Sequence, residues 1–154
     1  MDLSIDIKEN SKLNIRSAAL IKYQDNYFIS KRKDKDYYSI PGGRVSFNED
    51  SKETIIRELK EELDWNIKNN ELKLARIVEN FYKIKENFIH EYLFIYEIEI
   101  DKKYFDNGNF INLENSLMEM RWYKKDEFIK LNIKPNIIKD IILNNNFKHI
   151  INRD

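Results

Sequence analysis

The 154-residue chain contains no cysteine, which excludes disulfide bonds and thiol chemistry. Its two histidines, His90 and His149, are too few for a zinc site of the usual histidine and cysteine type. No apolar run approaches membrane-spanning length, and the segment from Met1 to Lys12 lacks the apolar core of a signal peptide. We therefore expect a cytoplasmic protein without a membrane partner.

The chain also lacks an excess of either charge. Lys and Arg number 27 and Asp and Glu number 27, so the formal net charge is +0 and no basic surface for duplex nucleic acid is expected. The length, with 42% hydrophobic and 35% charged residues, is typical of one globular domain, here residues 1–154. The sequence leaves the oligomeric state open, with a homodimer among the alternatives.

Glycine is scarce, and its placement is informative. The chain has 3 glycines, and Gly42 and Gly43 are adjacent, directly after Pro41. Neighbouring glycines let the backbone turn sharply and approach a ligand or metal closely. A peptide carbonyl of Gly42 or Gly43 is therefore a candidate oxygen ligand.

A cluster of negative charge follows this turn. From Glu49 to Asp64 the chain carries seven acids against three bases. The segment Ser51–Leu63 is predicted to be a helix, because Asp50 and Glu53 have capping-box spacing and an apolar stripe recurs at helical spacing through Leu59.

Three carboxylates, from Glu58, Glu61 and Glu62, lie at i, i+3 and i+4 on one face of this helix. Like charges at that spacing weaken an isolated helix, whereas a hard cation such as Mg²⁺ binds carboxylate oxygens. An acidic helix face alone is usually only solvated, so these glutamates do not identify a site without the surrounding spacing.

The complete spacing resembles the Nudix box, in which a glycine and a glutamate precede an Arg-Glu-aliphatic-x-Glu-Glu core. The positions that fall in register are Gly43, Glu49, Arg57, Glu58, Leu59, Glu61 and Glu62. Asp64 replaces the usual glycine after the core, and Trp65 replaces a smaller aliphatic residue. Aspartate tolerates the left-handed conformation better than most residues, so these departures affect the helix end and remove no ligand.

The resemblance implies an α/β protein, specifically an α/β/α sandwich with a mixed β-sheet. It implies hydrolysis, dependent on Mg²⁺ or Mn²⁺, of a phosphoanhydride in a nucleoside diphosphate linked to a group X or in a nucleoside triphosphate. X is not identified. The alternative is a non-catalytic module that senses a nucleotide, although every box carboxylate is present, which argues against it.

The same resemblance assigns roles within the box. The expected metal ligands are Glu58, Glu61 and Glu62, with a carbonyl of Gly42 or Gly43. Glu58, or an acid outside the box, would accept the proton from water, and Glu62 is also expected to be catalytic. Arg57 is expected to belong with Glu58 and Glu62 to the catalytic residues, where it would orient the carboxylates through ion pairs. Glu49 is expected to pair with Arg57 as a structural residue.

The flanking segments are expected to follow the same family order. Expected strands are Leu13–Tyr23, Tyr27–Arg32, Leu72–Val78, Asn80–Ile84, Phe88–Ile100 and Met120–Tyr123. Asp101–Met118 is expected to be a loop, Asp126 to cap a helical turn, and a final helix to begin near Pro135.

Candidates outside the box are two arginines and several acids. Arg16, inside an apolar strand, either reaches solvent or binds substrate phosphate. Arg32 corresponds, in the resemblance, to a basic residue near phosphate. Glu91, among apolar residues, is either an additional catalytic acid or the partner of a lysine. Glu119 and Glu114 are further candidate acids. The aromatic residues at strand spacing, including Phe94 and Tyr96, are expected in the core.

Overall fold

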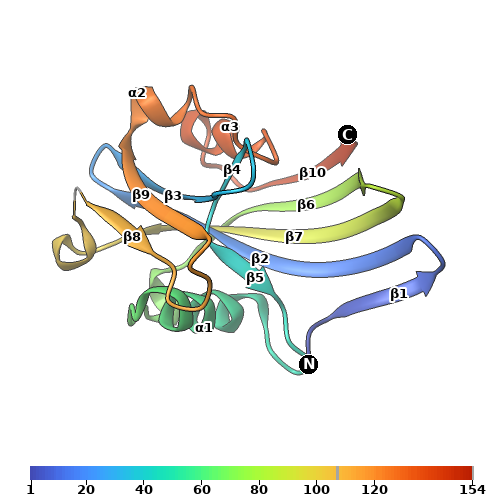
Figure 1. Ribbon diagram of the computed structural model, residues 1–154. Coiled ribbons are helices and arrows are strands. Elements are labelled where there is room, and N and C mark those ends of the chain that lie inside the picture. The colour runs from blue at the N-terminus through green and yellow to red at the C-terminus, as the bar shows by residue number, and fades with distance from the viewer. Residues whose placement is uncertain (107, 154) are drawn as a thin grey trace.

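The computed structural model describes residues 1–106 and 108–153. It contains one mixed sheet with helices on both faces (Figure 1), as expected of an α/β/α sandwich. The strands are β1 Ser4–Lys8, β2 Ser11–Tyr23, β3 Asn26–Arg32, β4 Tyr38–Ser39, β5 Gly42–Arg44, β6 Lys73–Ile84, β7 Asn87–Glu99, β8 Asn109–Ile111, β9 Met118–Lys124 and β10 Lys148–Arg153. The helices are α1 Ser51–Leu63, α2 Lys125–Phe128 and α3 Ile138–Leu143, with short 3₁₀ turns η1 Asn69–Glu71 and η2 Lys102–Tyr104.

Strand β2 is the centre of the sheet. The strand order is β10-β6-β7-β2-β3-β9-β8, and β1 and β5 also pair with β2. The β2–β7 and β10–β6 pairs are parallel, whereas the β2–β3, β3–β9 and β6–β7 pairs are antiparallel. The sheet is therefore mixed, as predicted.

Alternation along β2 explains why both faces of the sheet are covered. Ala19 and Ile21 pack against Ile55 and Leu59 of α1 on one face. On the other face Ala18 and Leu20, together with neighbouring strand residues, pack against the residues around α2 and α3. Figure 1 shows α1 below the sheet and α2 and α3 above it. The opposite end of the sheet, where β1 lies, carries no helix in this view.

Several boundaries differ from the sequence expectations. Leu72–Val78 and Asn80–Ile84 are not two strands, since β6 runs without a break from Lys73 to Ile84. The expected loop Asp101–Met118 contains η2 and β8. Asp126 is not the helix cap, because Lys124 occupies that position and Asp126 lies in the first turn of α2. Strands β1 and β10 were not predicted.

The connection that leads to β10 is held by the buried side chain of Arg76. The Arg76 side chain is fully buried in β6 and donates to the backbone carbonyl of Asn146 at 2.7 Å and to that of Asn144. These carbonyls belong to the segment that joins α3 to β10. Arg76 therefore satisfies backbone acceptors in the connection that places β10 beside β6.

Candidate active site

The two adjacent glycines bring the backbone of β5 against both β2 and α1. Gly43 lies opposite Ser17 of β2, and a Cβ atom at Gly43 would overlap the Glu58 carboxylate. A Cβ atom at Gly42 would instead overlap the backbone of Ser17 and Ala18. At Gly42 only glycine fits against this backbone, whereas at Gly43 a larger residue would have to displace the carboxylate of a predicted metal ligand.

Helix α1 begins and ends as the sequence predicts. Asp50 Oδ1 accepts hydrogen bonds from the backbone N–H of Lys52 at 2.8 Å and of Glu53 at 2.9 Å, and Glu53 accepts one from Asp50 N–H at 2.8 Å. This is the predicted capping box. At the other end Asp64 has φ 58° and ψ 31°, so aspartate adopts the left-handed conformation at the position where the resemblance led us to expect glycine.

Arg57 is the centre of a network of ion pairs. Its Nε donates to Glu49 at 2.7 Å, and a terminal nitrogen donates to Glu58 at 2.8 Å and to Glu61 at 3.1 Å. A further bond reaches the carbonyl of Arg44 at 3.1 Å. The fork of the guanidinium thus fixes the orientation of two carboxylates on the helix and of one in the segment before it.

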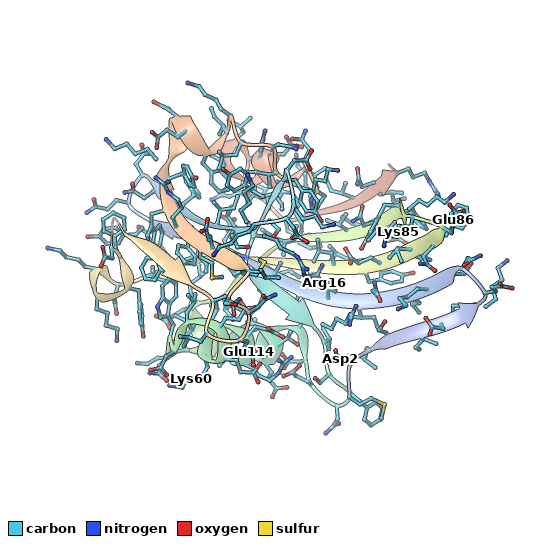
Figure 2. All side chains as sticks on the ribbon, in the orientation of Figure 1. Asp2, Arg16, Lys60, Lys85, Glu86 and Glu114 are labelled. Carbon is cyan, nitrogen blue, oxygen red and sulfur yellow. The ribbon has the colours of Figure 1, made fainter. Side chains whose placement is uncertain are left out.

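The carboxylates of Glu58, Glu61 and Glu114 form a group that could hold a metal ion, with one oxygen from each within 4.8 Å of the others. Glu58 and Glu61 come from α1, whereas Glu114 comes from the loop between β8 and β9. Figure 2 shows that loop, with Glu114 labelled, lying over α1. Glu62 is also a predicted ligand, but among the described residues it does not belong to this group of three.

Burial raises the pKa of two of the box glutamates. For Glu58 burial is the largest cause, opposed by its hydrogen bond with Arg57. For Glu62 burial, followed by the negative charge of Glu58, raises the pKa to about 7. The local environment therefore disfavours negative charge on these side chains, and a bound cation would reverse that preference.

A loop residue that the sequence analysis missed shapes this part of the site. Asn112 is buried, and its Oδ1 accepts from the backbone N–H of Glu114 at 2.9 Å and of Asn115 at 3.0 Å. Its side chain also acts on Glu62, where it lowers the pKa of the carboxyl against the larger effect of burial. The adjacent Leu113 N–H donates to the Glu62 carbonyl at 2.8 Å, so the loop is attached to α1. Asparagine in a loop is a general turn signal and does not reveal which helix the loop will meet.

Arg16 and Glu91 lie together on the sheet face opposite α1. Glu91 is only 3% exposed, and its carboxylate is 3.9 Å from an Arg16 nitrogen. It accepts hydrogen bonds from Tyr82 at 3.1 Å and from Asn80 at 3.3 Å. The Arg16 side chain is 42% exposed and lines a cavity together with Gly43. Glu91 therefore pairs with an arginine and not with a lysine.

The remaining candidates lie outside the carboxylate group. Arg32 is exposed at the end of β3, where its Nε donates to Asp34 at 2.6 Å. Glu119 on β9 is exposed and lies 3.7 Å from Lys33 Nζ. Within the described part of the chain, the loop acid that joins Glu58 and Glu61 is Glu114 and not Glu119.

The structure is an α/β sandwich in which an acidic helix lies beside a glycine turn. Comparison with known proteins supports the same class of protein. A family model described as NUDIX domain matches residues 13–143. The chain therefore belongs to the Nudix family, whose members are hydrolases that act on phosphorus-containing anhydrides.

Solved structures share the fold at low sequence identity. A mutator MutT protein from Bacillus halodurans has a TM-score of 0.70 and 18% identity over 88% of this chain and 86% of its own. A Nudix hydrolase from Nitrosomonas europaea has a TM-score of 0.63 and 16% identity over 92% and 79%. An Ap4A hydrolase from C. elegans has a TM-score of 0.55 and 15% identity over 85% and 94%. A search of curated proteins finds no match.

Proposed function

We propose that the protein is a Mg²⁺-dependent hydrolase, with Mn²⁺ as an alternative ion, that cleaves a phosphoanhydride bond. The substrate is a nucleoside diphosphate linked to a group X or a nucleoside triphosphate. The observation that carries the proposal is the group formed by Glu58, Glu61 and Glu114 beside the Gly43 backbone. Membership of the family supports the reaction class.

The residues present fit a hard divalent cation. Carboxylate oxygens from two separate elements converge, and the main chain at Gly43 lies beside the Glu58 carboxylate. Oxygen donors of this kind suit Mg²⁺ or Mn²⁺. We assign Glu58, Glu61 and Glu62 as ligands, together with a carbonyl of Gly42 or Gly43, and add Glu114 on the basis of its position. A bound cation would offset charge on the phosphate oxygens and activate water.

The chain's own residues have distinct roles in this proposal. Arg57 holds the carboxylates of Glu58 and Glu61 in one orientation, and Glu49 anchors Arg57 from the other side. Glu58, Glu62 or an acid outside the box accepts the proton that water releases. Arg57 does not contact substrate, because its described hydrogen bonds already go to carboxylates and a carbonyl.

Two arginines are assigned to substrate phosphate. Arg16 is half-exposed next to the glycine turn, and Arg32 lies at the end of β3, close to the loop that carries Glu114, since Lys33 N–H donates to the Leu117 carbonyl at 2.9 Å. An arginine fork suits phosphate oxygens. We assign Glu91 to the support of Arg16, with a role as catalytic acid as the alternative, and keep Glu119 as a second candidate acid.

We also propose that residues 1–154 act as one domain, because both core clusters share a single sheet. No helix in residues 1–106 or 108–153 is long and apolar enough to cross a membrane. A cytoplasmic location, the absence of duplex nucleic acid as a partner, and a homodimer remain predictions.

The test is hydrolysis of a substrate panel by protein that has been stripped of metal. The panel contains nucleoside triphosphates, dinucleoside polyphosphates, nucleotide sugars, ADP-ribose and capped RNA ends, with phosphate or nucleoside monophosphate measured. Turnover should appear on addition of Mg²⁺ or Mn²⁺ and disappear with EDTA. Undiminished turnover in metal-free buffer would refute the metal mechanism. A nucleotide that stabilises the protein and is recovered intact would instead identify a sensing module.

A further inference from the structure

A cavity of about 940 Å³ extends from the glycine turn along the sheet end that lacks helices. Its lining includes Gly43 and Arg16 at one end and residues of β1, β2, β6 and β7 beyond them. Since Gly43 also touches the Glu58 carboxylate, this cavity adjoins the proposed metal site. Its volume is that of a small-molecule site.

The end nearest the metal site has a fixed positive charge. Glu91 is buried in β7, and hydrogen bonds from Asn80 at 3.3 Å and from Tyr82 at 3.1 Å hold its carboxylate in place. That carboxylate lies 3.9 Å from Arg16, whose side chain is 42% exposed toward the cavity. The buried acid thus positions the guanidinium while leaving donors on it for a phosphate oxygen.

Beyond Arg16 the charges of the cavity balance. The remaining lining has as many acids as bases: Asp2, Asp6 and Glu9 against Lys8, Lys12 and Arg44. Lys12 lies 3.5 Å from Asp6, and Arg44 lies 3.9 Å from Asp2. A second anionic group placed here would meet as many carboxylates as cations, so this part of the cavity provides no net attraction for the terminal phosphates of a polyphosphate.

The uncharged part of the lining has hydrogen-bonding groups and a small apolar surface. The exposed amides of Asn10 and Asn87 each offer both donors and an acceptor, whereas the buried Asn14 offers its amide nitrogen, because its Oδ1 already accepts from the Ser4 hydroxyl at 2.7 Å. The half-buried ring of Tyr82 and the side chain of Ile89 supply the apolar surface. This combination suits a ring that carries several hydroxyl groups, because hydroxyls donate and accept while the ring's C–H face packs on apolar atoms.

We propose that this cavity binds the group X, and that X is an uncharged, hydroxyl-rich ring, so that the preferred substrate is a nucleoside diphosphate bearing a glycosyl group. This rests on the proposed hydrolase function and narrows its substrate. Water supplies an oxygen to one phosphorus, the bridging oxygen leaves with the other, and the released proton passes to a site carboxylate. The products are a nucleoside monophosphate and a glycosyl phosphate.

The experiment compares an ADP-linked hexose with ATP, which share the same nucleoside. With Mg²⁺, the kcat/KM of wild type should be at least about ten-fold higher for the sugar diphosphate, the ratio that about 1.4 kcal/mol of differential binding produces. Asp6→Lys gives the cavity an excess of positive charge at a side chain that is 80% exposed. It should shift the ratio of the two kcat/KM values at least about five-fold toward ATP.

Glu99→Lys is the matched control, because Glu99 is exposed near the end of β7, outside the cavity lining, and the charge change is identical. It should leave the ratio within about two-fold. The inference is overturned if wild type cleaves ATP as well as the sugar diphosphate, or if the two variants change the ratio equally.

Binding is measured separately by calorimetry, in the Glu58→Gln variant, so that cleavage is not required. The sugar diphosphate should bind at least about five-fold more tightly than ATP, and Asp6→Lys added to this variant should reduce that preference. If neither compound is cleaved by wild type while this binding preference holds, the proposed hydrolase activity is wrong and the assignment of the cavity stands. Equal affinities would overturn the cavity assignment itself.

Discussion

The three glycines of the chain should respond in three different ways to a single added methyl group. Gly43→Ala is the informative substitution, because its Cβ would overlap the Glu58 carboxylate. That carboxylate is the end of a flexible side chain and can move aside, so the fold should survive. A displaced ligand should lower kcat at least about 100-fold, since even outer partners of metal ligands are worth 10–100-fold. The melting temperature should change by no more than about 2 °C, because removing glycine from the unfolded chain offsets part of any strain.

Gly42→Ala and Gly108→Ala are the controls. At Gly42 the added Cβ would lie 2.6 Å from Ala18 Cα, which is backbone that cannot rotate away. Overpacking of this kind costs about 1–3 kcal/mol, and the melting temperature should fall by about 5–10 °C. At Gly108 the nearest atom would be Asp106 Oδ1, at an ordinary 3.4 Å, so stability and turnover should stay close to wild type. Calorimetry and steady-state kinetics on all three variants provide the test. A Gly43→Ala enzyme with wild-type kcat would show that Glu58 need not occupy its observed position.

Three further predictions concern glutamates and an aromatic residue. Glu58→Gln and Glu62→Gln should each lower kcat by several orders of magnitude while leaving the fold intact. The control Glu53→Gln, in the capping box, should lower the free energy of unfolding by about 1 kcal/mol or less and change turnover little. Equal, small losses of kcat in Glu58→Gln and Glu53→Gln would show that the acidic face is ordinary surface. Tyr96→Ala should lower the free energy of unfolding by about 3–5 kcal/mol, because the side chain is only 4% exposed. The control Phe88→Ala replaces a side chain that is 60% exposed and should change this free energy by less than about 0.5 kcal/mol. Urea denaturation measures both. Hydrogen bonding to Arg57 lowers the folded-state pKa of Glu49 from 4.5 to about 2, so its contribution to stability is present above pH 4.5 and is lost as the pH falls toward 2. Glu49→Gln should therefore lower the free energy of unfolding by about 1.5–3 kcal/mol at pH 7 and progressively less below pH 4.5. An equal loss at pH 7 and pH 3 would contradict the ion-pair explanation.

Helix α1 was predictable because its signals are local. The capping box at Asp50, the apolar stripe through Leu59 and the stop at Asp64 lie within one short stretch of sequence, and the structure has the same bounds, Ser51–Leu63. The central strands were predictable for a similar reason, since burial on both faces of the sheet selects apolar runs such as Ala18 to Ile21 within β2.

Strands β1 and β10 were missed because backbone pairing with a neighbouring strand keeps them in the sheet, while many of their apolar side chains stay exposed. Ile5 and Ile7 in β1 are 51% and 63% exposed, and Ile151 in β10 is 61% exposed. Their positions depend on hydrogen bonds to β2 and β6, which a local pattern does not encode. The place of Glu114 depends in the same way on a contact between distant segments, the bond from Leu113 to Glu62.

The buried side chain of Arg76 implies unusual behaviour at β10, which stands at the edge of the described sheet. Strands that pair on one side only ordinarily open readily, and their amide protons exchange with solvent much faster than those of the core. Here Arg76 binds the Asn144 and Asn146 carbonyls from inside the sheet, so releasing β10 would leave its charged guanidinium in a dry environment with only the Ala75 carbonyl as acceptor. Opening of this edge is therefore expected to be coupled to opening of β6, and the amide protons of both strands should exchange together.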